Sequence, residues 1–285
     1  MQREPAFDIA PVPGWQASLD LRFERRENAT LLSRRHHRGP LRVQKALYPE
    51  GEQVCHAIVL HPPSGIAGGD ELEISVEVGA SGHALLTTPG AGKWYRSAAP
   101  WARQALNFEV AADAILEWLP QETIVFDGAL AHLENRVRLA AGAGYMGWEV
   151  LCLGRRAAGE SFEHGALRLA TRIERDGKPL WLERGRLEGG SPLLDSAVGL
   201  AGCSVSATLL AAGRTVEPAL LASCREIPPG ESGAQYGVTV LPQLLVARYL
   251  GHSSEAARAW LVQLWRLLRP ALLGREAQPP RIWNT

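Results

Sequence analysis

Hydrophobic and polar side chains alternate along much of this chain. In residues 71–78 (ELEISVEV), Leu72, Ile74, Val76 and Val78 take every second position, and glutamate or serine takes the others. Alternation with a period of two is typical of a strand that buries one face. Similar alternation or short apolar runs predict further strands at residues 55–60, 83–88, 104–110, 114–119, 122–128, 134–140, 147–153, 167–175, 179–187 and 204–211.

The spacing of these runs narrows the fold class. A parallel pair joined through a helix needs a connection of a dozen or more residues, and the runs lie too close together for that. A doubly wound α/β sheet is therefore excluded as the main architecture. The dipeptide Asp176-Gly177 between two runs favours a tight hairpin. Because no long linker interrupts the chain, we predict one mainly β domain over residues 1–285, built as a sandwich, a barrel or a β-helix.

A different periodicity occurs near the C-terminus. Residues 241–251 and 253–270 carry apolar side chains at helical spacing, which predicts a helical pair within residues 241–270. Ser253 or Ser254 is a suitable N-cap for the second helix, and Pro270 is a suitable stop. Residues 271–285 form a C-terminal tail. Its segment 274–285 has two prolines near an Arg-Ile-Trp group and is not expected to be helical.

Composition and charge exclude several classes of protein. Thirty Lys and Arg balance thirty Asp and Glu among 285 residues, and 46% of the residues are hydrophobic, which is ordinary globular composition. Zero net charge argues against nucleic acid and the membrane surface as partners. Four widely spaced cysteines and an N-terminus with acids and prolines instead of an apolar signal sequence predict a soluble, cytoplasmic protein. Eight scattered histidines form no ligand motif, so no permanent metal site is expected.

The segment HPPSGIAGGD (61–70) follows a predicted strand and is rich in proline and glycine. His61, Pro62, Gly68 and Gly69 would form a stiff loop scaffold, in which proline fixes the backbone and glycine allows positive φ. Such a loop could present Asp70, or backbone amides, to a small ion or a partner. The alternative is an elaborate turn that Asp70 caps.

The segment TTPGAGKWYRS (87–97) contains a cluster of basic and aromatic residues, Lys93, Trp94, Tyr95 and Arg96. Tyrosine, tryptophan and arginine are the residues that most often dominate binding interfaces. This tip could bind an anion or another protein. The alternative is a hairpin end whose aromatic rings fold onto the edge of a sheet.

Four further carboxylates lie in or beside predicted strands: Glu122, Asp127, Glu149 and Glu160. A carboxylate in an apolar strand is costly unless it is paired or coordinates a cation. Arginines at 155, 156, 184 and 186 offer pairing, and a cation site is the alternative. Glu122 and Asp127 are five residues apart, which on a strand places them on opposite faces, so they form no local acid–base pair.

Five segments together resemble one family. GPLRVQKALYPEG (39–51), CHAIVLHPPSGIAGGDEL (55–72), TTPGAGKWYRS (87–97), LEWLPQETIVFDGA (116–129) and the terminal PRIWNT (280–285) are similar, in this order, to the urease accessory protein family UreD, called UreH in some organisms. Two positions depart from the family pattern. Ser64 replaces a glycine and Ala67 replaces a larger aliphatic residue, both within the 61–70 loop.

The resemblance implies a chaperone for nickel insertion into urease rather than an enzyme, with an irregular, β-helix-like stack of strands and two helices. It implies binding to apo-urease and to UreF, which recruits the GTPase UreG, and a water-filled passage for Ni²⁺. Nickel would be transient cargo, and no cofactor would be permanently bound. We expect Asp70, Glu122, Asp127, Glu149 and Glu160 to line or gate this passage, because weak oxygen ligands release nickel more readily than nitrogen or sulfur ligands.

The same resemblance suggests where partners bind. Trp260 and Trp265 on an exposed helix face, and Trp283 in the tail, would contact UreF. The alternative for the helix is burial of its apolar stripe in the core, which need not include both tryptophans. The tip formed by Lys93, Trp94, Tyr95 and Arg96 would face urease. Two other functions stay open: a purely structural adaptor between UreF and urease with no ion path, and an all-β enzyme that uses a carboxylate such as Asp70, Glu122 or Asp127 as general base.

Overall fold

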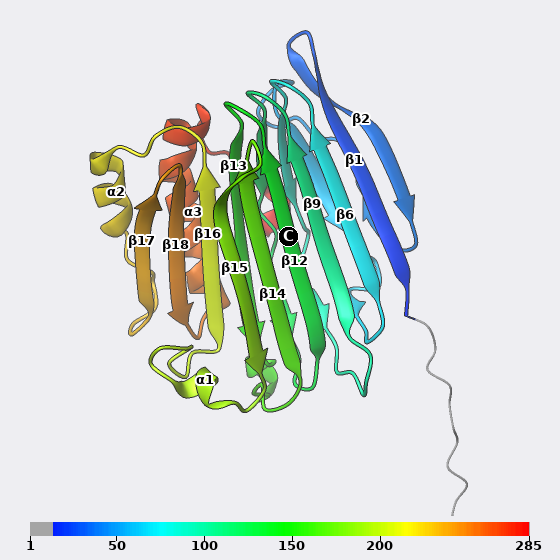
Figure 1. Ribbon diagram of the computed structural model, residues 1–285, viewed down its shortest axis with the longest axis vertical. Helices are drawn as coiled ribbons and strands as arrows, with labels where there is room; N and C mark the ends of the chain where they lie inside the picture. Colours follow the sequence, from blue (N-terminus) through cyan, green and yellow to red (C-terminus); the bar gives the residue numbers. More distant parts are fainter. Residues whose placement is uncertain (1–13, 285) are drawn as a thin grey trace, which may run out of the picture.

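Two large sheets lie face to face, and the helix α3 covers the outer face of one of them (Figure 1). The computed structural model describes residues 14–284; the N-terminal segment judged to lack a signal sequence lies mostly outside this range, as does Thr285. The strands are β1 (Gln16–Arg26), β2 (Ala29–Arg38), β3 (Arg42–Val43), β4 (Cys55–Leu60), β5 (Gly65–Ile66), β6 (Glu71–Val78), β7 (His83–Thr87), β8 (Gly92–Trp94), β9 (Ala102–Val110), β10 (Ile115–Trp118), β11 (Thr123–Val125), β12 (Leu130–Leu139), β13 (Gly144–Leu153), β14 (Ala166–Arg175), β15 (Lys178–Glu188), β16 (Val205–Ala212), β17 (Gln235–Leu241) and β18 (Leu244–Gly251). The helices are α1 (Pro192–Asp195), α2 (Pro218–Arg225) and α3 (Ser254–Leu273), with short 3₁₀ turns at Arg156–Ala158 and Arg281–Asn284.

The central strands wind into coils of a β-solenoid. The chain passes from a strand of the seven-stranded sheet (β15-β14-β12-β9-β6-β1-β2) to one of the 11-stranded sheet (main order β17-β18-β16-β13-β10-β7-β4-β3), and then to a short strand at a third side. As a result β6, β9 and β12 are parallel neighbours, and so are β7, β10 and β13. The strands β5, β8 and β11 stack in parallel on the third side. The prediction of a mainly β, β-helix-like fold is confirmed.

Short arcs turn the chain from one large sheet to the other. Residues 79–82, 111–114 and 140–143 connect successive strand pairs, and each arc closes with a hydrogen bond from its fourth amide to its first carbonyl, at 2.9–3.1 Å. The third residue of each arc has positive φ: 57° at Ser81, 56° at Asp113 and 71° at Gly142. Parallel strands are thus joined through the opposite sheet without helices, which explains the close spacing of the strand signals.

The strands with alternating sequences bury their apolar face, as the alternation predicts. In β6 the side chains of Leu72, Ile74, Val76 and Val78 are at most 3% exposed, because they face the space between the sheets. The predicted hairpin at Asp176-Gly177 is also confirmed. It joins β14 to β15 with both central residues at positive φ, the geometry that matches the twist of paired strands.

The helical pair predicted for residues 241–270 is half wrong. Residues 244–251 form β18, which pairs with β16 and β17, so a β-hairpin precedes α3. The segment is apolar on both faces because β18 lies between the inter-sheet core and α3. The second helix is confirmed, and Ser253 caps it by accepting a hydrogen bond from the amide of Ala256 at 3.1 Å. Pro270 lies inside the helix, which continues to Leu273 and ends at Gly274 with φ of 71°.

The packing of α3 corrects the expectation that two tryptophans face outward. Trp260 and Trp265 are both fully buried, in a second core between α3 and the outer face of the 11-stranded sheet. The Trp260 indole donates to the carbonyl of Ile227 at 2.9 Å. A large aromatic ring at helical spacing is well suited to such a core, and neither ring offers a surface to a partner.

Candidate functional site

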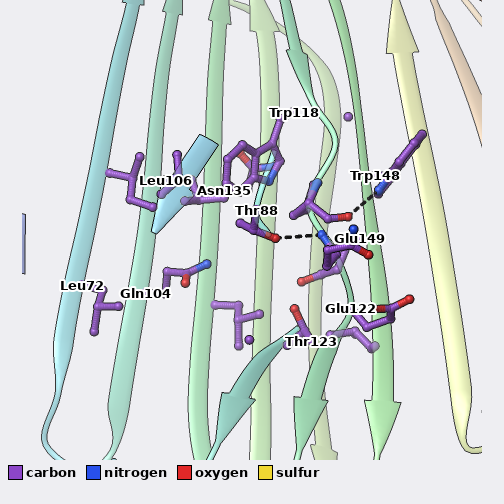
Figure 2. Close-up of a pocket in the computed structure, with 18 of the residues that line it drawn as sticks. Leu72, Thr88, Gln104, Leu106, Trp118, Glu122, Thr123, Asn135, Trp148 and Glu149 are labelled. Carbon is purple, nitrogen blue, oxygen red and sulfur yellow. Dashed lines mark hydrogen bonds between the residues drawn. The ribbon is translucent and has the colours of Figure 1, made fainter. Parts of the chain in front are cut away.

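A cavity of about 280 Å³ lies between the two sheets (Figure 2). Its apolar wall includes Leu72 and Leu106 from the seven-stranded sheet and Trp118 from the 11-stranded sheet. Its volume far exceeds the roughly 15 Å³ that one water molecule requires. Polar side chains also line it, so the cavity has the mixed surface that a hydrated ion needs.

A row of six polar residues crosses the inter-sheet space at one level. In the seven-stranded sheet, Asn135, Thr171 and Glu183 are cross-strand neighbours on β12, β14 and β15. In the 11-stranded sheet, Glu149, Thr208 and Arg248 are neighbours on β13, β16 and β18. All except Arg248 line the cavity. We call these six residues the polar row; they carry a hydrophilic surface from the cavity to the edge at β15 and β18.

Glu149 is the central acid of the polar row. Its carboxylate has no hydrogen-bond or ion-pair partner among residues 14–284, although the residue is half-buried on the wall of the cavity. Burial, together with the charge of Glu183, raises the pKa of Glu149 to about 7. An unpaired acid of this kind is a common feature of functional sites, because its neutralisation requires a proton or a cation.

The raised pKa of Glu149 predicts a loss of stability with rising pH. The folded chain holds a proton on Glu149 that the unfolded chain, with an ordinary pKa near 4.5, has released, so the free energy of unfolding should fall between about pH 4.5 and pH 7. Glu149→Gln should remove this loss and be more stable than the parent chain at pH 8, with a smaller difference at pH 5. Urea unfolding at the two pH values measures this.

The matched control is Glu174→Gln on the outer face of the seven-stranded sheet. Hydrogen bonding to Arg172 lowers the pKa of Glu174, so its carboxylate stabilises the chain above the ordinary pKa. This variant should be less stable than the parent at pH 8, which is the opposite sign. Equal pH profiles for the parent chain and Glu149→Gln would show that Glu149 is not held neutral.

A second acid, Glu122, lies at another part of the cavity wall, on the turn before β11. It forms an ion pair with Arg258 of α3 at 3.4 Å. The turn is held by hydrogen bonds from the Gln121 amide to Thr88 and from the Trp148 indole to the Pro120 carbonyl, both drawn in Figure 2. Glu122 and Glu149 are thus the two predicted acids that the structure brings to one cavity.

The 61–70 loop uses Asp70 as a cap. Its carboxylate accepts hydrogen bonds from the amides of Trp15 and Ala67, both at 2.8 Å, and the side chain is buried. Gly69 has φ of 91°, so the glycine there meets a backbone requirement. His61 lines the cavity, and its Nε2 atom is buried without a hydrogen-bond partner in the described part of the chain. Burial lowers the pKa of His61, which favours the neutral ring.

The other members of this loop serve its shape. Gly68 packs so closely on Ser97 that a Cβ atom would lie 2.1 Å from the serine oxygen. Pro62 is exposed. The loop places an imidazole rather than the Asp70 carboxylate beside the cavity.

Asp127 and Glu160 belong to one network of loop contacts outside the cavity lining. Asp127 accepts hydrogen bonds from the amides of Glu163 and His164 and from Arg96, the last at 3.0 Å. Glu160 accepts from the Asp127 amide, and its other oxygen pairs with Arg155 at 2.7 Å. The predicted pairing of an acid with Arg155 is confirmed for Glu160. These two carboxylates already have protein donors around them.

The basic and aromatic tip is divided between interior and surface. Trp94 is buried in β8, and Lys93 contributes to the cavity wall. Tyr95 is 37% exposed and packs edge-on against Phe126, with ring centroids 5.1 Å apart. Arg96 is exposed beside Asp127. Only Tyr95 and Arg96 therefore offer a surface to a partner.

A buried charge network was not predicted from the sequence. Arg269 of α3 is fully buried and donates to Glu117 on β10 and to Glu50, with nitrogen–oxygen distances of 2.6–3.1 Å. His83 contacts Glu117 at 2.7 Å, and His56 contacts Glu50 at 2.6 Å. The sequence does contain a sign that these charges are buried. Arg269 lies four residues after Trp265, within the apolar stripe, and Glu117 lies between apolar neighbours.

Trp283 anchors the C-terminal tail to the body. Its indole donates to Thr87 at 2.8 Å, and the ring packs between Trp148 and Trp265, with centroids 5.5 and 5.8 Å away. The tail therefore covers part of the wall that Trp148 shares with the cavity. Within residues 14–284, no three His, Cys, Asp or Glu side chains gather as a metal site, and no helix has the length and apolarity that a membrane crossing requires.

The fold and the cavity define a β-solenoid with a carboxylate-bearing internal cavity. The profile of the family described as "UreD urease accessory protein" matches residues 16–284. The "Urease accessory protein UreD" of Dechloromonas aromatica (strain RCB) is 58% identical over 276 residues, which cover 96% of this chain and 96% of that protein. The proteins of the same name from Azoarcus sp. (strain BH72) and Janthinobacterium sp. (strain Marseille) are 57% and 52% identical, covering 97% of this chain and 96% and 94% of those proteins.

The chain belongs to the UreD family of urease accessory proteins. The resemblance seen in the sequence motifs is confirmed. Membership supports a role in urease maturation, and the family carries the name of accessory proteins rather than of an enzyme.

Proposed function

We propose that this chain acts in urease maturation as a cytoplasmic chaperone that passes Ni²⁺ through the inter-sheet cavity to apo-urease. In this proposal UreF binds the chain and brings the GTPase UreG, which supplies the nickel. The observation that carries the proposal is the unpaired Glu149 carboxylate inside the cavity, with Glu183 close enough to raise its pKa.

The chemistry of the cavity suits a transient cation. Oxygen ligands from Glu149, from the threonines of the polar row and from Glu122 once it leaves Arg258 bind Ni²⁺ more weakly than a cluster of imidazoles or thiolates would. Conduction requires binding that is strong enough to admit the ion and weak enough to release it. His61 adds one neutral imidazole at the wall, which alone is insufficient to trap the ion.

The remaining acids have supporting roles in this proposal. Asp70 fixes the loop that carries His61, and Asp127 and Glu160 hold the loops around Arg96 and Arg155. Tyr95 and Arg96 are the exposed members of the surface proposed to face urease. Trp283 orients the tail that precedes the C-terminus, where contact with UreF is proposed.

The test is the nickel content of urease matured with Glu149→Gln or Glu122→Gln. Both variants keep the shape of the side chain but remove its charge, so nickel per urease should fall, most strongly for Glu149→Gln. Co-purification of urease and UreF must be retained, and Glu174→Gln on the outer face is the control. Normal nickel content in an assembled complex would favour the alternative function, an adaptor that joins UreF to urease without an ion path.

A further inference from the structure

One ion pair closes the polar row at the edge formed by β15 and β18. Arg248 donates to the Glu183 carboxylate across the gap between the sheets. The side chains of Arg248 and Glu183 are 51% and 33% exposed, so the pair lies where the row meets solvent. The Arg248 guanidinium also lies 5.7 Å from the centre of the Trp181 ring.

We propose that Arg248 is an intrinsic counter-cation that closes this end of the cavity, and that a divalent cation passes only when Arg248 leaves Glu183. This inference deepens the proposed function and rests on it. While the pair is formed, the guanidinium offsets the charge of Glu183 and keeps an approaching cation away from its carboxylate oxygens. When it leaves, Glu183 and Glu149 present two carboxylates to one divalent ion.

The surroundings allow Arg248 to move while its backbone stays fixed. β18 is held on both sides by β16 and β17, so movement is confined to the side chain. An ion pair with this exposure adds little stability, which makes it easy to break. The face of Trp181 provides a second position for the guanidinium through cation–π attraction.

The position of Arg248 distinguishes it from other surface arginines. Its neighbours in register, Thr208 and then Glu149, lead directly to the cavity. Arg186 on β15 is similarly exposed and also pairs with a glutamate, Glu188, but it lies on the opposite face of its strand from Glu183. Arg186 is therefore the matched control.

Access to the cavity can be measured with a cysteine placed behind the pair. Thr208→Cys in the full-length chain puts a thiol in the polar row, and its rate of modification is followed with two methanethiosulfonate reagents, the cationic ethylammonium and the neutral methyl compound. Peptide mass spectrometry separates this thiol from the four native cysteines.

Arg248→Met should raise the rate with the cationic reagent roughly five- to tenfold relative to the rate with the neutral reagent, because one repelling charge is removed. Arg186→Met should change neither rate, and Arg248→Lys should stay near the parent. Equal acceleration of both reagents would overturn the proposal in favour of simple steric obstruction, and unchanged rates would overturn it outright.

A second measurement needs no substitution at position 248. Raising the salt concentration weakens the exposed ion pair, so Arg248 leaves Glu183 more often. The rate with the cationic reagent should then rise relative to the rate with the neutral reagent in the Thr208→Cys chain itself. Absence of this salt effect counts against the proposal even if Arg248→Met does not fold.

Failure of this inference can be told from failure of the proposed function. If Glu149→Gln lowers the nickel content of urease while Arg248→Met leaves the modification rates unchanged, the cavity remains the path and Arg248 does not close it. If the rates depend on Arg248 while Glu149→Gln leaves nickel unchanged, the charge controls access to a cavity that does not carry nickel.

Discussion

Replacing Arg269 with alanine is expected to abolish stable folding of the chain. The substitution leaves the buried carboxylates of Glu117 and Glu50 without their guanidinium partner, and breaking a buried ion pair in this way costs about 3–5 kcal/mol. Burial alone would raise the pKa of Glu117, but His83 and Arg269 overcome it and lower that pKa to about 2. A loss of this size is a large part of the stability of an ordinary domain.

The measurement is urea unfolding followed by circular dichroism, with the soluble yield as a second readout. Arg266→Ala is the matched control, because Arg266 is on the same helix but exposed, and it should change stability little. Arg269→Met combined with Glu117→Gln and Glu50→Gln should recover part of the loss, since no unpaired charge then remains. Equal stability of Arg269→Ala and Arg266→Ala would show that the network does not hold α3 on the sheet.

This network shows one limit of reading the sequence. The hydrophobic pattern of a helix predicts burial only for apolar positions. Arg269 is charged and interrupts the apolar stripe of α3, so the pattern gave no reason to expect that it is buried. Its partners Glu117 and Glu50 lie 152 and 219 residues away in the chain, so only the fold brings the three together. The prediction for Trp260 and Trp265 was wrong for a different reason. A tryptophan ring suits an interface and a core equally well, and both rings pack in the core between α3 and the 11-stranded sheet.

The strands were predictable because each carries its own signal, whereas the coil repeat was not. The alternation in residues 71–78 predicts β6 without any other part of the chain. The arcs that define the coils, GASG (79–82), AADA (111–114) and AAGA (140–143), share only small residues and a positive φ. The three long strands that begin the coils start at residues 71, 102 and 130, so no fixed period marks the repeat. β18 was misread because a strand buried on both faces lacks alternation.

Glu149 and Glu183 illustrate how far the site could be predicted. Glu149 was selected because it is an acid in an apolar strand, and the structure places it in the cavity. Glu183 was missed because it lies on the edge strand β15 among arginines and glutamates, where a charged residue is ordinary, and not in an apolar strand as Glu149 does. What makes Glu183 part of the polar row is its register with Thr171 on the neighbouring strand of the same sheet, and the register between two strands is a property of the fold.

Filling the cavity with Thr171→Trp is expected to stop nickel transfer while leaving assembly intact. Thr171 points into the inter-sheet space on β14 and lines the cavity. A tryptophan there would occupy much of the cavity, so nickel per urease should fall by about an order of magnitude if the ion travels this way. The measurement is the metal content of urease purified together with the variant chain.

The control is the next residue of the same strand, Arg172→Trp. Arg172 faces outward and pairs with Glu174 at 2.6 Å, an exposed contact of small energetic weight. The two variants add the same ring at adjacent positions on opposite faces of one sheet. If nickel passes through the cavity, only Thr171→Trp should lower the nickel content of urease. If the chain is an adaptor that works through its surface, either neither variant lowers it or Arg172→Trp lowers it more. The comparison therefore separates conduit from adaptor without altering any charge in the polar row.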